Sequence, residues 1–171
     1  FGTVNTASGE ASGAFGRYNN AEGIRSVAFG YDNDAVATDS SAVGNKNKAN
    51  AANANAYGTL NEANGGNSSA VGYFNTASNA NSSAFGTSNI ASGNSSSAFG
   101  VGNKATGMNS VAFGLNNNAT GVNAMAFGIG SLAGNIGSVA IGYQSVADRD
   151  FAIAVGNAGV VHQIIHLADG T

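Results

Sequence analysis

Small and apolar residues recur along this chain with a period of fourteen. A glycine stands at every fourteenth position, and one apolar residue precedes each of these glycines: Gly2, Gly16, Gly30, Gly44, Gly58, Gly72, Gly86, Gly100, Gly114, Gly128, Gly142 and Gly156. From the second copy on, that apolar residue follows an alanine. A second unbroken alanine column stands five positions after the glycine, from Ala7 to Ala147. No insertion interrupts the series, so the pattern predicts a repeat architecture rather than a low-complexity coil.

Fourteen residues suffice for one coil with two short strands and two tight turns. The interior of such a coil is narrow, so alanine fits it and phenylalanine would force the strands apart. A glycine-rich column follows seven residues after the first: Gly9, Gly23, Gly65, Gly93, Gly107 and Gly121, with Asn79 and Asn135. We expect the two columns at the two corners, where the backbone has positive φ or lies close to its neighbour. The sequence therefore predicts an all-β solenoid of fourteen-residue coils.

Asparagine forms a third column. It stands three residues after the glycine in nine copies, from Asn5 to Asn117, and Ser131 and Ser145 replace it in the next two. Identical amides in successive coils can hydrogen-bond to one another, which predicts a stacked ladder rather than a ligand site.

The apolar column is expected to point out of the coil, because side chains alternate across a strand and each apolar residue follows an inward alanine. At the usual strand spacing these residues form a stripe about 50 Å long. Monomers rarely expose such a patch, and copies of the same chain around a symmetry axis would bury it. The alternative is that the rings pack within their own column and stay half exposed. The predicted interface comprises Phe15, Phe29, Val43, Tyr57, Val71, Phe85, Phe99, Phe113, Phe127, Ile141 and Val155.

The composition argues against several structural and functional classes of protein. The 171 residues include 26 Gly, no Pro and no Cys, and only 9% are charged, with a net charge of −3. The lack of cysteine excludes a disulfide framework and a thiolate metal site. The small net charge, without a cluster of Lys or Arg, argues against nucleic-acid binding. The charged residues avoid the repeated columns and fall between them, as expected for positions that face solvent.

The repeat motif resembles a known family. Ser-Val-Ala-Phe-Gly at 26–30 and 110–114, and Ser-Val-Ala-Ile-Gly at 138–142, are similar to the head repeats of trimeric autotransporter adhesins, above all the YadA-like head. The resemblance covers residues 1–156. It implies a left-handed parallel β-roll in which three chains share an axis on a bacterial outer surface.

The columns fail after Gly156, and residues 157–171 resemble the neck of the same family, which usually reads Arg-Gln-Ile-x-Asn-Val-Ala-x-Gly-Thr. The positions that we expect to form the neck include His162, Gln163, Ile164, His166 and Leu167, with His162 in place of the usual Arg and His166 in place of the usual Asn. The resemblance implies that this segment ties neighbouring chains together and leads to a coiled-coil stalk outside this sequence. The series also begins in mid-repeat at Phe1-Gly2, so we expect a piece of a longer protein.

Few residues suggest chemistry. His162 and His166 stand four apart, but only Asp169 is spaced to join them, whereas a structural zinc site normally needs four protein ligands. The acidic residues lie on separate coils, so neither a Ser-His-Asp set nor a carboxylate pair is expected. The sequence predicts no enzyme, no metal and no cofactor.

The leading hypothesis is the head of an adhesin at the bacterial cell surface, anchored in the outer membrane through a C-terminal region outside this sequence. The head itself is expected to touch neither membrane nor nucleic acid. The resemblance implies multivalent binding to matrix proteins such as collagen, fibronectin or laminin, although no residue selects among them. The outer positions expected to make contact are Thr6, Ser8, Glu22, Lys48, Glu62, Thr76 and Lys104.

The alternative is a non-adhesive solenoid, either a rigid spacer or an ice-binding surface. An ice-binding face should repeat Thr regularly along one column, and here Thr is only intermittent.

Overall fold

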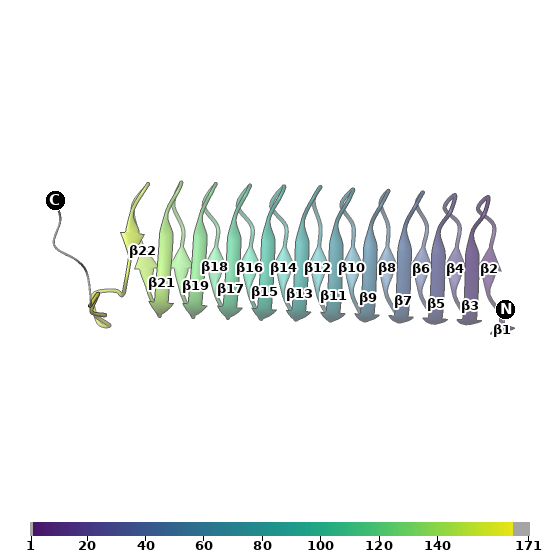
Figure 1. Cartoon of the computed structure of the whole chain (residues 1–171), viewed down its shortest axis with the longest axis horizontal. Helices are drawn as coiled ribbons and strands as arrows, with labels where there is room; N and C mark the ends of the chain where they lie inside the picture. The colour runs from purple at the N-terminus through teal and green to yellow at the C-terminus, as the bar shows by residue number, and fades with distance from the viewer. Residues whose placement is uncertain (1, 166–171) are drawn as a thin grey trace.

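The computed structural model describes residues 2–165 and shows a parallel β-solenoid, a row of stacked coils that runs from β1 (Gly2–Thr3) to β23 (Ile153–Ala154) (Figure 1). Each full coil contributes one long and one short strand, so two parallel sheets run the length of the molecule. The register pairs residues fourteen apart, for example Gly16 with Gly30. The all-β solenoid of fourteen-residue coils is thereby confirmed, while the hand of the coil stays a prediction.

The first sheet has twelve strands, five residues long except at the two ends. They are β1 (Gly2–Thr3), β3 (Gly13–Arg17), β5 (Val27–Tyr31), β7 (Ser41–Asn45), β9 (Asn55–Thr59), β11 (Ser69–Tyr73), β13 (Ser83–Thr87), β15 (Ser97–Val101), β17 (Val111–Leu115), β19 (Met125–Ile129), β21 (Val139–Tyr143) and β23 (Ile153–Ala154).

The second sheet has eleven strands of two residues each. They are β2 (Thr6–Ala7), β4 (Asn20–Ala21), β6 (Asp34–Ala35), β8 (Lys48–Ala49), β10 (Glu62–Ala63), β12 (Thr76–Ala77), β14 (Ile90–Ala91), β16 (Lys104–Ala105), β18 (Asn118–Ala119), β20 (Leu132–Ala133) and β22 (Val146–Ala147). Among the described residues no helix is long and apolar enough to cross a membrane.

The core consists of alanine. One alanine column comes from each sheet, as with Ala70 of β11 and Ala77 of β12, and both side chains are fully buried. The interior is thin because nothing larger than a methyl group separates the sheets at these positions. A column of buried serine, which the sequence analysis missed, completes the core; Ser40, for instance, donates its hydroxyl to the Ala37 carbonyl at 2.6 Å.

The first glycine column does not lie at a corner, contrary to the prediction. Gly72 stands inside β11 with φ of +120°, a backbone conformation that L side chains rarely adopt. A Cβ there would lie 2.1 Å from the carbonyl oxygen of Gly86 in the next coil. The column is therefore required by positive φ and by close packing of successive coils, and the bend follows two residues later, at Phe74 with φ of 55°.

The second glycine-rich column does open a corner, as predicted. In the turn from Gly65 to Ser68, the Ser68 N–H donates to the Gly65 carbonyl at 3.1 Å, and Asn67 has φ of 55°. A positive φ at the third residue is typical of a type II turn. Gly65 itself lacks positive φ, but a Cβ there would lie 2.0 Å from the Asn79 carbonyl oxygen.

The asparagine column forms the predicted ladder along one edge of the core. The Oδ1 atom of Asn47 accepts from both the backbone N–H and the Nδ2 of Asn61, at 3.1 and 3.0 Å. The Nδ2 of Asn61 also lies 3.0 Å from the Tyr57 carbonyl and 2.7 Å from that of Gly72. Each amide thus joins three coils and satisfies backbone groups that would otherwise be unpaired inside the solenoid.

The regular coils end at Gly156. Its carbonyl accepts the N–H of Val146 at 2.9 Å, and the chain then reverses at Asn157, whose Oδ1 accepts the N–H groups of Gly159 and Val160 at 2.7 and 2.9 Å. An isolated antiparallel bridge joins Gly156 to Val161. Parallel stacking therefore stops where the sequence columns fail, although the division into 1–156 and 157–171 stays a prediction.

Candidate functional site

The apolar column lies on the outer face of the first sheet. Single-chain exposure is 46% for Phe15, 54% for Phe29 and 55% for Phe113, so these side chains point away from the alanine core as predicted. The rings also pack along the column, with the Phe85 and Phe99 centroids 5.2 Å apart and nearly parallel. Packing within the column therefore covers only part of each ring, and a continuous apolar stripe remains on one side of the solenoid. We call it the aromatic stripe; it consists of the eleven residues predicted above as the interface.

The column two residues earlier borders the aromatic stripe. It holds small or polar residues in most of the N-terminal coils, such as Ser41 of β7, and larger apolar ones towards the C-terminus. Met125 is 39% exposed and Ile153 is 71% exposed. The apolar surface is therefore widest in the C-terminal coils.

The outer face of the second sheet is different. Its outward column changes from coil to coil, and the seven positions predicted to make contact (Thr6, Ser8, Glu22, Lys48, Glu62, Thr76 and Lys104) are all exposed or half-buried. Thr6 and Thr76 belong to this column, but Ile90, Lys104 and Leu132 take the same place in other coils. A variable column of this kind lacks the regular Thr array that an ice-binding face requires.

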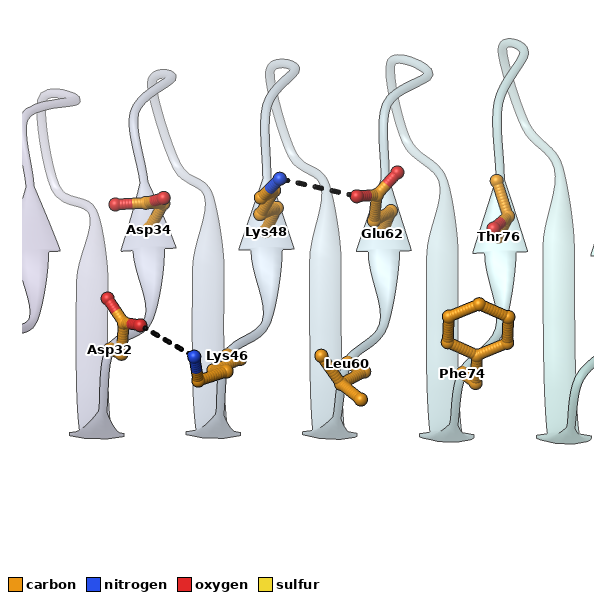
Figure 2. Close-up of a pocket in the computed structure, with 8 residues that line it drawn as sticks. All are labelled: Asp32, Asp34, Lys46, Lys48, Leu60, Glu62, Phe74 and Thr76. Carbon is orange, nitrogen blue, oxygen red and sulfur yellow. Dashed lines mark hydrogen bonds and ion pairs between the residues drawn. The ribbon is translucent and has the colours of Figure 1, made fainter.

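A hollow of about 370 Å³ lies on this face, over β6 to β12 (Figure 2). Two rows of side chains line it, each with one residue per coil. The first row is Asp32, Lys46, Leu60 and Phe74, and the second is Asp34, Lys48, Glu62 and Thr76. Three members of the second row, Lys48, Glu62 and Thr76, are among the predicted contact positions, but the cluster itself was not predicted because its members stand fourteen apart in the chain. The signal in the sequence was that the residues of each row occupy the same position in successive repeats.

Ion pairs connect neighbouring coils within the hollow. The Lys46 Nζ lies 3.5 Å from an Asp32 carboxylate oxygen, and the Lys48 Nζ lies 3.4 Å from Glu62 Oε1. All four side chains are about half exposed, and such pairs are worth roughly 0.2–1 kcal/mol in solvent. By contrast, Arg25 and Asp39 form a two-pronged pair outside the hollow, with both N···O distances at 2.6 Å.

The carboxyl groups of Asp34 and Asp39 have pKa values that are shifted in opposite directions. Partial burial, followed by the nearby charge of Asp32, raises the pKa of Asp34, while a hydrogen bond with Asn20 and the charge of Lys48 counteract this only in part. The hydrogen bond from Arg25 lowers the pKa of Asp39. Asp32 and Asp34 form the acidic end of the hollow, and burial disfavours the charged form of Asp34 there.

His162 lies against the last coil. Its Nε2 is 3.0 Å from the Tyr143 carbonyl oxygen, the kind of acceptor that takes a backbone N–H from the following coil elsewhere in the solenoid. Gln163 and Ile164 are exposed, and His166 and Leu167 lie outside the described residues. The neck assignment of these five positions stays a prediction.

Among residues 2–165, no group of three or more His, Cys, Asp or Glu side chains is placed to hold a metal ion. The described ionisable groups lie on the outer surfaces of the coils and on the segment after them. The solenoid therefore presents two long surfaces, an apolar one on the first sheet and one of mixed charge on the second.

A long, thin, repetitive solenoid with such surfaces defines a structural or binding module. The family model for the YadA head domain repeat matches residues 6–33, 63–89, 91–117, 119–142 and 133–158, which together cover most of the chain. The chain belongs to the YadA head domain family, whose members are heads of trimeric autotransporter adhesins. The comparison with curated proteins gave no match.

Proposed function

We propose that this chain forms a homotrimeric adhesin head in which the aromatic stripe of each copy is buried against the other two. The observation that supports this is the continuous outward column of apolar residues, several about half exposed in the single chain. Burying the exposed half of one such ring contributes about 1 kcal/mol at the usual value for apolar area. A narrow stripe that runs parallel to the coil axis suits close packing around one shared axis.

The trimer then presents its three mixed-charge faces outward. We propose that these faces attach the bacterium to extracellular matrix proteins, with collagen, fibronectin and laminin as the first candidates. Three identical faces, each many coils long, favour binding through several weak contacts at once. This proposal also places the protein at the cell surface, with the segment 157–171 as a neck towards an outer-membrane anchor.

Solid-phase binding of the purified trimer to immobilised collagen, fibronectin and laminin tests this function. Binding that saturates, and that weakens when the trimer is dissociated, is the expected result. If the intact trimer binds none of the three, the adhesive function is wrong for these partners and a rigid spacer becomes the better account. The observation that favours the spacer is the unbroken pairing of all twelve strands in the first sheet.

A further inference from the structure

We propose that the hollow over β6 to β12 binds an extended polypeptide that carries a basic, an acidic and an apolar side chain at alternate positions. This inference rests on the proposed adhesive function, because it names the chemistry of the partner that the outer face would hold. It starts from the order of charge along the two rows (Figure 2).

The rows present three zones along the solenoid axis. Asp32 and Asp34 lie together in one coil and Lys46 and Lys48 in the next. The apolar pair Leu60 and Phe74 occupies the first row of the two coils after that, beside Glu62 and Thr76 in the second row. Phe74 is 59% exposed and stands beside Tyr73, with ring centroids 6.3 Å apart. An exposed aromatic pair next to charged groups is typical of an anchoring position in a protein interface.

The spacing of the zones matches a strand. Successive coils are about 4.8 Å apart, so the basic zone lies about 5 Å from the acidic zone, and the apolar zone lies about 10–14 Å from it. Along an extended chain, residues on one face recur about every 6.6 Å. Side chains at positions i, i+2 and i+4 therefore reach the acidic, basic and apolar zones in turn, in the order basic, acidic, apolar.

The charges of the hollow are available to such a partner. Both ion pairs in it are single contacts of 3.4–3.5 Å between half-exposed groups, so a partner's charge can replace either one at small cost. Partial burial and the neighbouring charge of Asp32 raise the pKa of Asp34, so a cation placed beside these two carboxylates would favour their ionised form. Three carboxylates against two lysines line the hollow, which disfavours a polyanion such as a sulfated polysaccharide.

Fluorescence anisotropy with two labelled dodecapeptides tests the inference. One carries the core Lys-Thr-Glu-Thr-Phe and the other the charge-exchanged core Glu-Thr-Lys-Thr-Phe, with identical flanking residues. The protein should bind the first peptide about three- to tenfold more tightly than the second, since two exposed charge pairs are exchanged. The double variant Asp34→Lys with Lys48→Asp leaves neither zone with a net charge, so it should abolish this preference.

The matched control is Lys104→Glu, which changes a lysine of the same outward column outside the hollow, in β16. It should leave both affinities unchanged. Equal binding of the two peptides, no binding of either, or tighter binding of heparin through Lys46 and Lys48 would overturn the inference. If the peptides fail while the trimer still binds a matrix protein, the hollow is wrong and the adhesive function stands. If the peptides bind as expected but no matrix protein does, the adhesive function is wrong.

Discussion

The Oδ1 atom of Asn75 accepts two hydrogen bonds from Asn89, one from its backbone N–H and one from its Nδ2, both at 3.0 Å. The same pair of contacts recurs between asparagines fourteen residues apart along the ladder. From Asn19 to Asn117 each amide is fully buried, so its hydrogen bonds have no competition from solvent. The ladder and the backbone pairing together hold successive coils in one register.

Replacing Asn61 by Ala should destabilise the solenoid strongly. The change leaves the Asn75 N–H without its side-chain acceptor and removes the donor to the carbonyls of Tyr57 and Gly72. Each buried group left unpaired costs about 1–3 kcal/mol. The midpoint of guanidinium unfolding, followed by circular dichroism, measures the loss.

Asn61→Ser is the matched control, because serine occurs naturally in this column. Ser131 Oγ reaches the Gly142 carbonyl at 2.6 Å and that of Phe127 at 3.2 Å. The serine variant should therefore lose less stability than the alanine variant. Equal losses would show that a hydroxyl donor to the carbonyls of Tyr57 and Gly72 does not contribute to stability.

Alanine substitutions at two glycines should differ in their effect on stability, because only one of these glycines is required by the backbone geometry. Gly72→Ala should destabilise the protein by several kcal/mol or prevent folding, since the new Cβ would lie 2.1 Å from the Gly86 carbonyl oxygen at a φ of +120°. Gly66→Ala should be neutral or stabilise by up to about 1 kcal/mol, because its nearest neighbour is 3.9 Å away. Thermal unfolding of the two variants distinguishes them, and a similar Tm for both would contradict this account.

A charge within the aromatic stripe should abolish self-association. Phe99 lies between Phe85 and Phe113 in the column, with ring centroids 5.2 and 6.3 Å away. Phe99→Asp would place a carboxylate in the centre of the proposed interface, where burial without a partner is costly. Sedimentation equilibrium should then give about a third of the wild-type mass, with the β-sheet circular dichroism spectrum retained.

Ile90→Asp serves as the control for this variant. Ile90 is 37% exposed on the outer face of the second sheet, in the short strand that follows β13. The variant should sediment as the wild type does. Dissociation by both substitutions, or by neither, would place the self-association surface elsewhere.

Two carboxylates should respond to pH in opposite ways. Because the pKa of Asp34 is raised by burial and by Asp32, its ionisation in the folded state opposes folding. The contribution of protonated Asp34 to stability is fully present below the pKa that this group has in the unfolded chain. It is lost as pH rises through the pKa that the group has in the folded protein. Asp34→Asn should therefore raise the free energy of unfolding at pH 7 by less than about 1 kcal/mol, which raises the Tm slightly. At pH 3 the substitution should raise neither quantity.

Asp39→Asn is the opposite case. Because the hydrogen bond from Arg25 lowers the pKa of Asp39, its contribution is present above the unfolded pKa and is lost as pH falls through the folded pKa. This variant should be less stable than wild type at pH 7, and the difference should shrink towards pH 2. NMR titration of the two side-chain carboxyls checks the order directly, and a pKa of Asp34 below that of Asp39 would refute it.

The sequence alone determined the coil length, the alanine core, the outward aromatic stripe and the asparagine ladder. Each of these features occupies a fixed position in the fourteen-residue repeat. Because side chains alternate between the two faces of a strand, the position also decides which column faces inward. Tertiary structure decided where the chain bends. Val4, Leu60 and Phe74 all have positive φ, although such residues rarely favour it, so the bend comes from stacking against neighbouring coils rather than from residue type. Only the stacking also brought Asp32, Lys46 and Leu60 side by side, because residues fourteen apart in the chain are neighbours across the sheet.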